Sequence, residues 1–344
     1  MKLSEFSYNL PKELIAQEPV SPRDHSRLMV LNRRTKEIIH RHFYDLPKFL
    51  LKGDILVLND SKVIPAKLVG KKESGGKSEV LILRELPNNN WEIILKARRL
   101  KNNSKIIFNK NFYLTLVKKL SDQTWEAEFN LKEKEFWQAI NEFGQAPLPP
   151  YIKKSSDLKK YQTIYAKIEG SVAAPTAGFH FTENLMVELK NKGIVFEYVT
   201  LHVGLGTFQP VRDENIEEHK IHKEYAILDE ETAKRLNQYK NDGRRIVAVG
   251  TTATRVLEFA VDENGQLRPF SGDVDIFIYP GYQFSARGGK FFIDDLITNF
   301  HLPETTLLML VCAFADKDFI MEAYQKAIQK KYRFYSFGDA MMIM

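Results

Sequence analysis

The hydrophobic pattern of this 344-residue chain changes twice along its length, and these changes limit the folds it can adopt. Between residues 64 and 129, six short segments are rich in β-forming residues or alternate apolar with polar positions, and turn residues such as Gly75 and Gly76 separate them. Such a series predicts a small antiparallel barrel. Strand-like segments at 27–32 and 54–59 precede it, so the barrel interrupts another unit.

The sequence after residues 147–151, a proline-rich and therefore stiff connector, alternates between helical and strand-like patterns. Alternation of this kind favours a mostly parallel sheet. We therefore predict an α/β main domain with a mostly parallel sheet, plus an inserted small antiparallel β-barrel domain. The main domain takes residues 1–60 and 150–344, and the barrel takes 61–149. The predicted strands after the connector are 195–202, 245–249 and 275–279, and the predicted helices are 183–192, 229–242, one from 254, 307–315 and 318–330.

Positive charge is concentrated in the predicted barrel. Residues 61–150 hold 16 lysines and arginines against 10 aspartates and glutamates, which matches the net charge of +6 of the whole chain. A local positive excess attracts a polyanion such as RNA, although a lysine-rich solvated surface explains the same charge. The candidate RNA-binding residues are Lys71, Lys72, Arg98, Arg99 and Lys101 in the barrel, and Lys153 and Lys154 beyond it.

Cysteine and hydrophobic content indicate the compartment. The single cysteine, Cys312, lies in the apolar run 307–315, so an intrachain disulfide is excluded and a reducing environment fits. No apolar run reaches the roughly 20 residues that a membrane span needs, and the first residues lack the apolar centre of a signal peptide. The expected protein is soluble and cytoplasmic, with no membrane partner.

Three glycine- or proline-containing segments carry histidines in surroundings that neither a core nor an ordinary loop requires. Residues 170–182 contain His180, residues 201–211 contain His202, and residues 299–310 contain His301. Glycine allows a backbone to approach a ligand closely, and histidine titrates near neutral pH. One such histidine alone is typical of a hydrogen-bonded structural residue, whereas three in similar contexts favour a shared binding site.

A turn at 249–256 follows an apolar strand and opens a helix with Thr251 and Thr252. Backbone N–H groups at a helix start favour an anion, although a routine turn with a threonine cap has the same pattern. The turn matches neither the dinucleotide nor the Walker glycine pattern. His219 and His222 are three residues apart without a third ligand at a recognisable spacing, so we predict no metal site.

These segments, together with residues 332–340, resemble the family of S-adenosylmethionine:tRNA ribosyltransferase-isomerases of queuosine biosynthesis along nearly the whole chain. The resemblance implies transfer and isomerisation of the ribosyl moiety of S-adenosylmethionine onto 7-aminomethyl-7-deazaguanine at the tRNA wobble position. The product is epoxyqueuosine, and adenine and methionine are released. It further implies S-adenosylmethionine as co-substrate, no metal, a tRNA anticodon stem-loop as partner, and a monomer.

The resemblance also raises the aromatic and polar residues of these segments to site candidates. Two functions of other classes stay open: a non-catalytic RNA-binding protein, which explains the charge but not the histidines, and an ordinary S-adenosylmethionine-dependent RNA methyltransferase, which lacks support from a glycine-rich first turn. Release of adenine and methionine separates the three. The catalytic candidates are His180, His202, His301 and Glu304; the candidates for S-adenosylmethionine binding are Ser171, Thr176, Gly178, Gly204, Gly206, Thr207, Thr251, Thr252, Arg255 and Tyr282.

Overall fold

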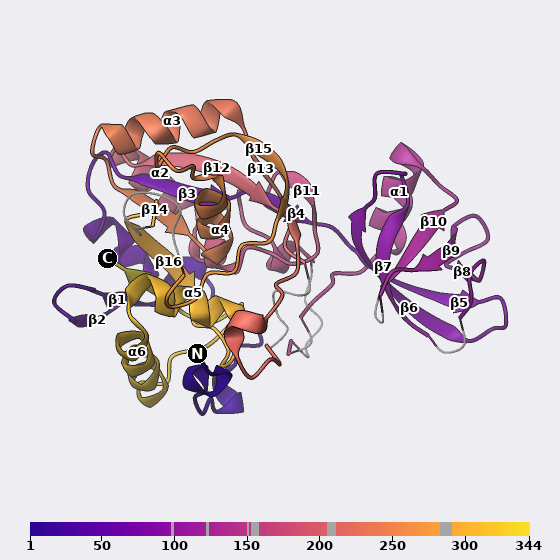
Figure 1. Ribbon diagram of the computed structural model, residues 1–344, viewed down its shortest axis with the longest axis horizontal. Coiled ribbons are helices and arrows are strands. Elements are labelled where there is room, and N and C mark those ends of the chain that lie inside the picture. Colours follow the sequence, from indigo (N-terminus) through magenta and orange to yellow (C-terminus); the bar gives the residue numbers. More distant parts are fainter. Residues whose placement is uncertain (98–99, 122–123, 150, 153–157, 205–210, 283–290) are drawn as a thin grey trace.

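A nine-stranded sheet forms the centre of the larger unit (Figure 1). The computed structural model describes residues 1–97, 100–121, 124–149, 151–152, 158–204, 211–282 and 291–344. Across the sheet the order is β15 (Phe270–Val274), β13 (Glu224–Leu228), β12 (Val195–Leu201), β3 (Ile55–Asn59), β14 (Ile246–Val249), β16 (Asp295–Asn299), β17 (Ala340–Ile343), β1 (Arg27–Leu31) and β2 (Ile38–His42). The central strands β12, β3, β14 and β16 are parallel, and antiparallel pairs flank them, so the sheet is mixed.

Helices cover both faces of this sheet because its strands alternate their buried side chains. Ile55 and Val57 of β3 face one layer, and Leu56 and Leu58 face the other. The first layer contains α3 (Glu230–Asn241), α4 (Thr251–Ala260), α5 (Thr306–Ala315) and α6 (Lys317–Gln329), and the second contains the 3₁₀ helix η4 (Phe43–Lys48) and α2 (Glu183–Asn191). The predicted α/β main domain is therefore confirmed.

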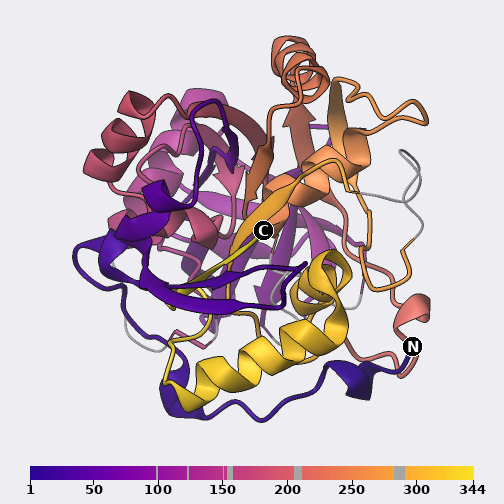
Figure 2. The same cartoon turned by 90° about the vertical axis from the view of Figure 1, so that its left-hand side faces the viewer.

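The N-terminal strands and the last helix lie together although the chain separates them widely. Figure 2 shows α6, in yellow, beside the indigo β1–β2 hairpin. The Lys36 ammonium in the hairpin turn lies 4.7 Å from the centre of the Phe319 ring in α6, and Arg27 donates a hydrogen bond of 2.7 Å to the Lys330 carbonyl. The two ends of the chain thus share one layer.

The six predicted β-rich segments form one closed antiparallel barrel, which confirms the inserted domain type. Its core contains apolar side chains from each strand, and α1 (Glu133–Phe143) closes one end with Phe136 and Ile140. Trp91 stacks on Phe136 with 4.7 Å between ring centres. The barrel order is β10 (Thr124–Phe129), β7 (Trp91–Lys96), β6 (Lys77–Glu85), β5 (Lys67–Lys72), β8 (Lys105–Ile107) and β9 (Tyr113–Lys119).

Two chain segments connect the barrel to the α/β domain (Figure 1). They begin in a small parallel sheet of β4 (Ser61–Val63) and β11 (Ile168–Ser171). A side-chain contact also crosses between the units, because Arg84 of β6 pairs with Glu92 at 2.9 Å and with Asp273 of β15 at 3.3 Å. This contact fixes one point of the surface where the two units face each other.

One predicted strand is wrong. Residues 275–279 are extended but form no strand; the ladder partner of β13 is the segment just before them, β15. Ile276, Phe277 and Tyr279 instead pack against the core as a connecting segment. Within the part of the chain that the structure describes, no helix has the length and apolar character needed to cross a membrane.

Candidate functional site

The segments that follow β12, β14 and β16 line a hollow at the edge of the sheet where these parallel strands end. Ligands of open α/β sheets bind outside the carboxyl ends of their strands. We call this hollow the edge cavity. The space inside it that a water molecule can enter is about 40 Å³. The residues used below are Val203, Gly250, Thr251, Thr252, Thr298, Asn299 and His301 from the strand ends, with Thr176, Tyr335 and Ser336 from two other segments.

The first turn of α4 lies against the edge cavity. Gly250 precedes this helix with φ 94°, a left-handed conformation that glycine adopts without strain. Thr251 and Thr252 are 6% and 7% exposed and line the cavity. The Thr252 Oγ1 atom is buried and has no hydrogen-bond partner among the described residues. A helix start with a buried, unpartnered hydroxyl suits an anionic group.

His301 lines the edge cavity and is neutral. Its backbone is fixed by hydrogen bonds from Tyr8 Oη to its carbonyl and from its N–H to Tyr324 Oη at 3.0 Å. Its Nε2 atom lies 2.9 Å from Thr298 Oγ1. Burial lowers the pKa of His301 to about 3. A neutral imidazole accepts a proton but does not supply one at neutral pH.

His180 lies behind Asn299 and lines a smaller neighbouring hollow, which shares Ser336 with the edge cavity. Its Nδ1 lies 2.7 Å from Ser26 Oγ, and the Asn299 amide lies 3.3 Å from its Nε2. Because an amide NH₂ only donates, Nε2 accepts and Nδ1 carries the proton. Burial, with smaller contributions from Arg333 and Arg23, lowers the pKa of His180 to about 3. His180 therefore holds Asn299 in place and does not reach the cavity directly.

His202 is not among the residues that line the edge cavity. Successive residues of an extended segment point to opposite sides, and its neighbour Val203 faces the cavity. The His202 ring instead lies against Gly170 and is parallel to the Tyr225 ring within 11°. Burial lowers the pKa of His202 below its ordinary value. The structure thus brings together His301 and, through Asn299, His180, while His202 lies apart.

Two of the small candidate residues support the cavity wall. The Ser171 hydroxyl donates to the Ala173 carbonyl at 2.7 Å and accepts the Val203 N–H at 2.8 Å, which uses its bonding capacity within the protein. Gly178 is required by packing, because a Cβ at this position would lie 1.9 Å from Tyr165 Oη. Thr176, in the 3₁₀ helix η6 (Thr176–His180), does line the cavity and donates to Asn299 Oδ1 at 3.4 Å.

Arg255 points into a different hollow, where it forms a buried ion pair with Glu224 of β13. The same carboxylate accepts the Gly204 N–H at 2.8 Å. The pair ties α4 to β13 and fixes the start of the loop after β12. The structure therefore gives Arg255 and Gly204 a supporting position and not one on the edge cavity.

The remaining candidates lie elsewhere. Glu304, at φ 60°, uses its backbone to join Phe6 and Val211 and does not line the edge cavity. Tyr282 is partly buried against the core near Glu258. Lys71, Lys72 and Lys101 are on the barrel, and Lys71 and Lys101 are exposed. Gly206, Thr207, Arg98, Arg99, Lys153 and Lys154 lie outside the described residues.

Four polar residues of the edge cavity were absent from the sequence-based candidates: Thr298, Asn299, Tyr335 and Ser336. Thr298 and Asn299 end a fully buried strand, and polar residues in that position were the available signal. Tyr335 and Ser336 are uncharged and gave no comparable signal. Among the described residues, no three metal-ligating side chains lie together, and His219 is hydrogen-bonded to Asp213 at 2.8 Å.

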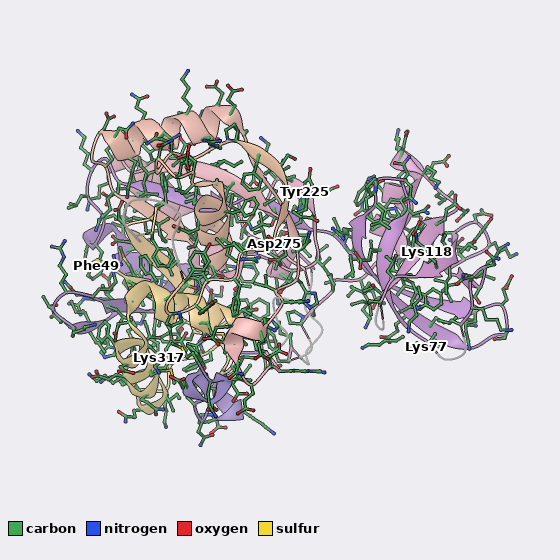
Figure 3. The ribbon with its side chains drawn as sticks, viewed as in Figure 1. Phe49, Lys77, Lys118, Tyr225, Asp275 and Lys317 are labelled. Carbon is green, nitrogen blue, oxygen red and sulfur yellow. The ribbon has the colours of Figure 1, made fainter. Side chains whose placement is uncertain are left out.

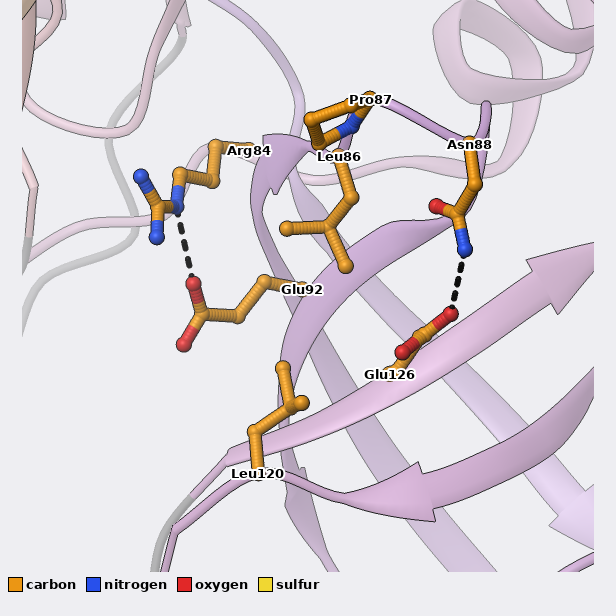
Figure 4. Close-up of a pocket in the computed structure, with 7 residues that line it drawn as sticks. All are labelled: Arg84, Leu86, Pro87, Asn88, Glu92, Leu120 and Glu126. Carbon is orange, nitrogen blue, oxygen red and sulfur yellow. Dashed lines mark hydrogen bonds and ion pairs between the residues drawn. The ribbon is translucent and has the colours of Figure 1, made fainter.

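A more open hollow, of about 450 Å³, lies on the barrel beside Arg84 (Figure 4). Apolar side chains of Leu86, Pro87 and Leu120 form part of it. The Glu126 carboxylate on its wall accepts amide hydrogens from Asn88 and Asn90, each at 2.7 Å. It contains no histidine and is far from the strand ends, so its size alone does not make it the reaction site.

Acidification is expected to destabilise the protein through His180 and His301. Both have a pKa of about 3 when folded, whereas an unfolded histidine binds a proton near pH 6.5. Below pH 6.5 the unfolded state therefore holds more protons, and the free energy of unfolding falls by up to about 1.4 kcal/mol per pH unit for each histidine, down to about pH 3. Urea unfolding at several pH values measures this slope.

The control for this experiment is a His180→Gln, His301→Gln double variant, which keeps polar side chains but cannot titrate in that window. Its free energy of unfolding should depend less steeply on pH between 6.5 and 4. Equal slopes in the two proteins would show that these histidines do not govern the acid sensitivity.

Comparison with known proteins identifies the family of this chain. The chain matches the family described as queuosine biosynthesis protein over residues 3–343. It is 53% identical to the S-adenosylmethionine:tRNA ribosyltransferase-isomerase of Caldanaerobacter subterraneus subsp. tengcongensis and 51% identical to that of a Thermoanaerobacter species, with full coverage of all chains. The crystal structure of S-adenosylmethionine tRNA ribosyltransferase from Thermotoga maritima is 37% identical, with a TM-score of 0.57 over 99% of this chain and 100% of that one. The chain belongs to the queuosine biosynthesis protein family.

Proposed function

We propose that this protein transfers and isomerises the ribosyl moiety of S-adenosylmethionine onto 7-aminomethyl-7-deazaguanine at the wobble position of tRNA, giving epoxyqueuosine, adenine and methionine. The observation that carries the proposal is the full-length match to relatives named for this activity, at 53% and 51% identity. The protein is accordingly a transferase that uses S-adenosylmethionine and modifies tRNA.

The direct test is incubation of the protein with S-adenosylmethionine and a tRNA that carries the aminomethyl base. Mass spectrometry should show adenine and methionine in equal amounts and a correspondingly heavier tRNA base. Release of S-adenosylhomocysteine would instead identify a methyltransferase. RNA binding without any small-molecule product would identify a non-catalytic RNA-binding protein.

The edge cavity is the proposed site for S-adenosylmethionine. The carboxylate of S-adenosylmethionine fits the first turn of α4, where backbone N–H groups and the unpartnered Thr252 Oγ1 are available. The interior that a water molecule can enter is small, about 40 Å³, so the sulfonium and nucleoside are proposed to lie toward the open side of the hollow. Arg255 and Gly204 contribute by holding this wall, and the candidates at 206–207 lie in the segment after β12.

The proton steps follow from the protonation states of the histidines. The reaction must remove a proton next to the sulfonium and protonate the departing adenine. His301 is the proposed base because it is the candidate histidine that lines the edge cavity, where it is neutral. His180 orients Asn299, and neither Glu304 nor His202 is among the residues that line the edge cavity.

A Thr252→Val variant is expected to separate ligand binding from stability. Valine keeps the shape but removes the hydroxyl, so the KM for S-adenosylmethionine should rise about 10-fold if Oγ1 bonds the carboxylate. The free energy of unfolding should stay the same or increase slightly, because a buried unpartnered hydroxyl disappears. Steady-state kinetics and urea unfolding measure the two quantities.

Thr254→Val is the matched control, since Thr254 lies on the same helix with its hydroxyl bonded to the Gly250 carbonyl at 3.2 Å. It should leave the KM for S-adenosylmethionine unchanged. If Thr252→Val and Thr254→Val shift this KM equally, the hydroxyl of Thr252 is not a ligand for the co-substrate.

The barrel is the proposed contact for the anticodon stem-loop. Lys71 and Lys72 of β5 pair in register with Ile107 and Ile106 of β8, which places them next to Lys105, while Lys77 lies opposite Lys71 on β6. Figure 3 shows Lys77 and Lys118 on the surface of the barrel. The candidates Arg98, Arg99 and Lys101 follow β7, and Lys153 and Lys154 follow the connector.

Reversing charge on the barrel is expected to weaken tRNA binding and its salt dependence. In a Lys71→Glu, Lys72→Glu, Lys101→Glu variant, the slope of log K against log salt should become about 2 units less negative, at about 0.7 per phosphate contact. The control reverses three exposed lysines of the α/β domain, Lys12, Lys234 and Lys331. Equal loss of tRNA affinity in both variants would place the main contact elsewhere.

The proposal also includes the boundaries of the inserted domain and the assembly state. The pairing of β4 with β11 supports a break close to the predicted residue 61, with residues 61–63 in the connection between the units. The barrel, α1 and the residues up to 149 then form the insertion. We place the enzyme in the cytoplasm as a monomer, with its tRNA substrate.

A further inference from the structure

His202 and Tyr225 form an aromatic pair beside the edge cavity that the proposed reaction does not use. The two rings are nearly parallel, at 11°, with 6.2 Å between centres. Gly170, at φ 139°, lies so close to the His202 ring that a Cβ there would be 2.8 Å from Cε1. The His202 Nδ1 atom is buried and has no hydrogen-bond partner within the described ranges. A polar ring held by packing alone, with an unpartnered nitrogen, requires an explanation.

The position of Tyr225 indicates which kind of molecule the aromatic pair contacts. It lies on β13, is 41% exposed, and is paired in register with Asp273 of β15. Asp273 is the residue that Arg84 of the barrel contacts at 3.3 Å. Figure 3 shows Tyr225 on the side of the α/β domain that faces the barrel. A large exposed aromatic side chain therefore lies where the α/β domain and the basic barrel face each other.

We propose that the His202–Tyr225 pair is a stacking platform for an unpaired base of the tRNA substrate. This inference rests on the proposed function and names where its macromolecular substrate is held. An RNA whose phosphates lie along the basic barrel presents its unpaired bases toward the facing surface. Stacking on tyrosine suits any base, because every base has an aromatic face, and the His202 ring supports the Tyr225 ring from beside it.

The platform is also next to the proposed co-substrate site. Val203, which follows His202, lines the edge cavity, and Ala173, close to Gly170 in the chain, bridges to Val203. One short stretch of backbone thus has S-adenosylmethionine on one side and the RNA loop on the other. His202 then lies outside the edge cavity because it belongs to the RNA contact, whereas the edge cavity binds S-adenosylmethionine.

The test uses the full-length protein and an anticodon-arm RNA with 2-aminopurine at successive loop positions. Tyr225→Leu, which keeps apolar volume but loses the ring, should weaken RNA binding by roughly 10-fold or more and remove the fluorescence quenching at one loop position. Tyr225→Phe should bind within about twofold of the parent protein, and His202→Ala should lose part of the affinity. The KM for S-adenosylmethionine and the urea midpoint should not change for either Tyr225 variant.

Tyr44→Leu is the matched control, since Tyr44 is 43% exposed and stacks on His42 at 8° and 5.1 Å, on η4 away from β13. It should leave RNA binding unchanged. RNA affinity of Tyr225→Leu within twofold of the parent, or a loss equal to that of Tyr44→Leu, overturns the platform. Because equilibrium binding is read without turnover, a parent protein that binds the RNA but releases no adenine refutes the proposed reaction and still tests the platform.

Discussion

An Asn299→Ala variant is expected to lose about 10²-fold or more in kcat/KM. The Asn299 amide donates to the Tyr335 carbonyl at 3.1 Å and lies 3.3 Å from His180 Nε2, while its oxygen accepts from Thr176 at 3.4 Å. One side chain therefore joins three walls of the edge cavity. Displacement of a reacting group by about 1 Å is enough to cost 10²-fold in rate.

The matched control is Asn237→Ala. The Asn237 amide joins α3 to Leu267 through two hydrogen bonds, of 3.0 and 2.8 Å, at a place that does not line the edge cavity. Both variants should lose stability by a similar amount, which urea unfolding reports. Only Asn299→Ala should lose activity when kinetics are measured with S-adenosylmethionine and tRNA. Similar activities for the two variants would exclude a positioning role for Asn299.

An Arg255→Ala variant is expected to lose about 3 to 5 kcal/mol of stability. Both partners of the Arg255–Glu224 pair are buried, with side chains 5% and 4% exposed. Removing the guanidinium leaves the Glu224 carboxylate inside the protein without its cation, and such uncompensated charges are among the most destabilising changes. The free energy of unfolding from urea titration measures the loss.

Two further variants test whether the loss of stability comes from leaving a buried charge unpaired or from breaking any ion pair. Arg255→Met combined with Glu224→Gln removes both charges and keeps an acceptor for the Gly204 N–H, so it should recover more than half of the lost stability. Arg268→Ala breaks a pair whose arginine is 68% exposed, and it should cost less than about 1 kcal/mol. An Arg255→Ala loss no larger than that of Arg268→Ala would contradict the argument.

The barrel and most of the α/β domain were predictable because their segments carry clear local patterns. Each barrel strand alternates or is β-rich, and turn residues separate the strands. The strands β16 and β17 were missed because four or five buried residues without alternation, such as Ala340–Ile343, look like any short apolar run. The error at 275–279 has a different cause: residues 276–279 are a continuous apolar run like a buried strand, but β13 pairs with β15 just before it.

The candidate site was predictable only as a set of loops. The sequence identified the segments that end at the edge cavity, since glycine, threonine and histidine stand out there. It gave no means of placing Arg255, whose partner Glu224 is on a strand three elements earlier, or of deciding that Val203 and not His202 faces inward. Such assignments depend on strand register, which becomes visible only in three dimensions.

The place of β17 in the sheet has a consequence for how the main domain holds together. β17 lies between β16 and β1, so the β1–β2 hairpin joins the other strands of the sheet only through β17. Tyr335 and Ser336, which form part of the wall of the edge cavity, lie just before this strand. Detachment of β17 would divide the sheet into two parts and disturb the cavity wall at the same time, so the sheet and the shape of the cavity should be lost in one cooperative opening.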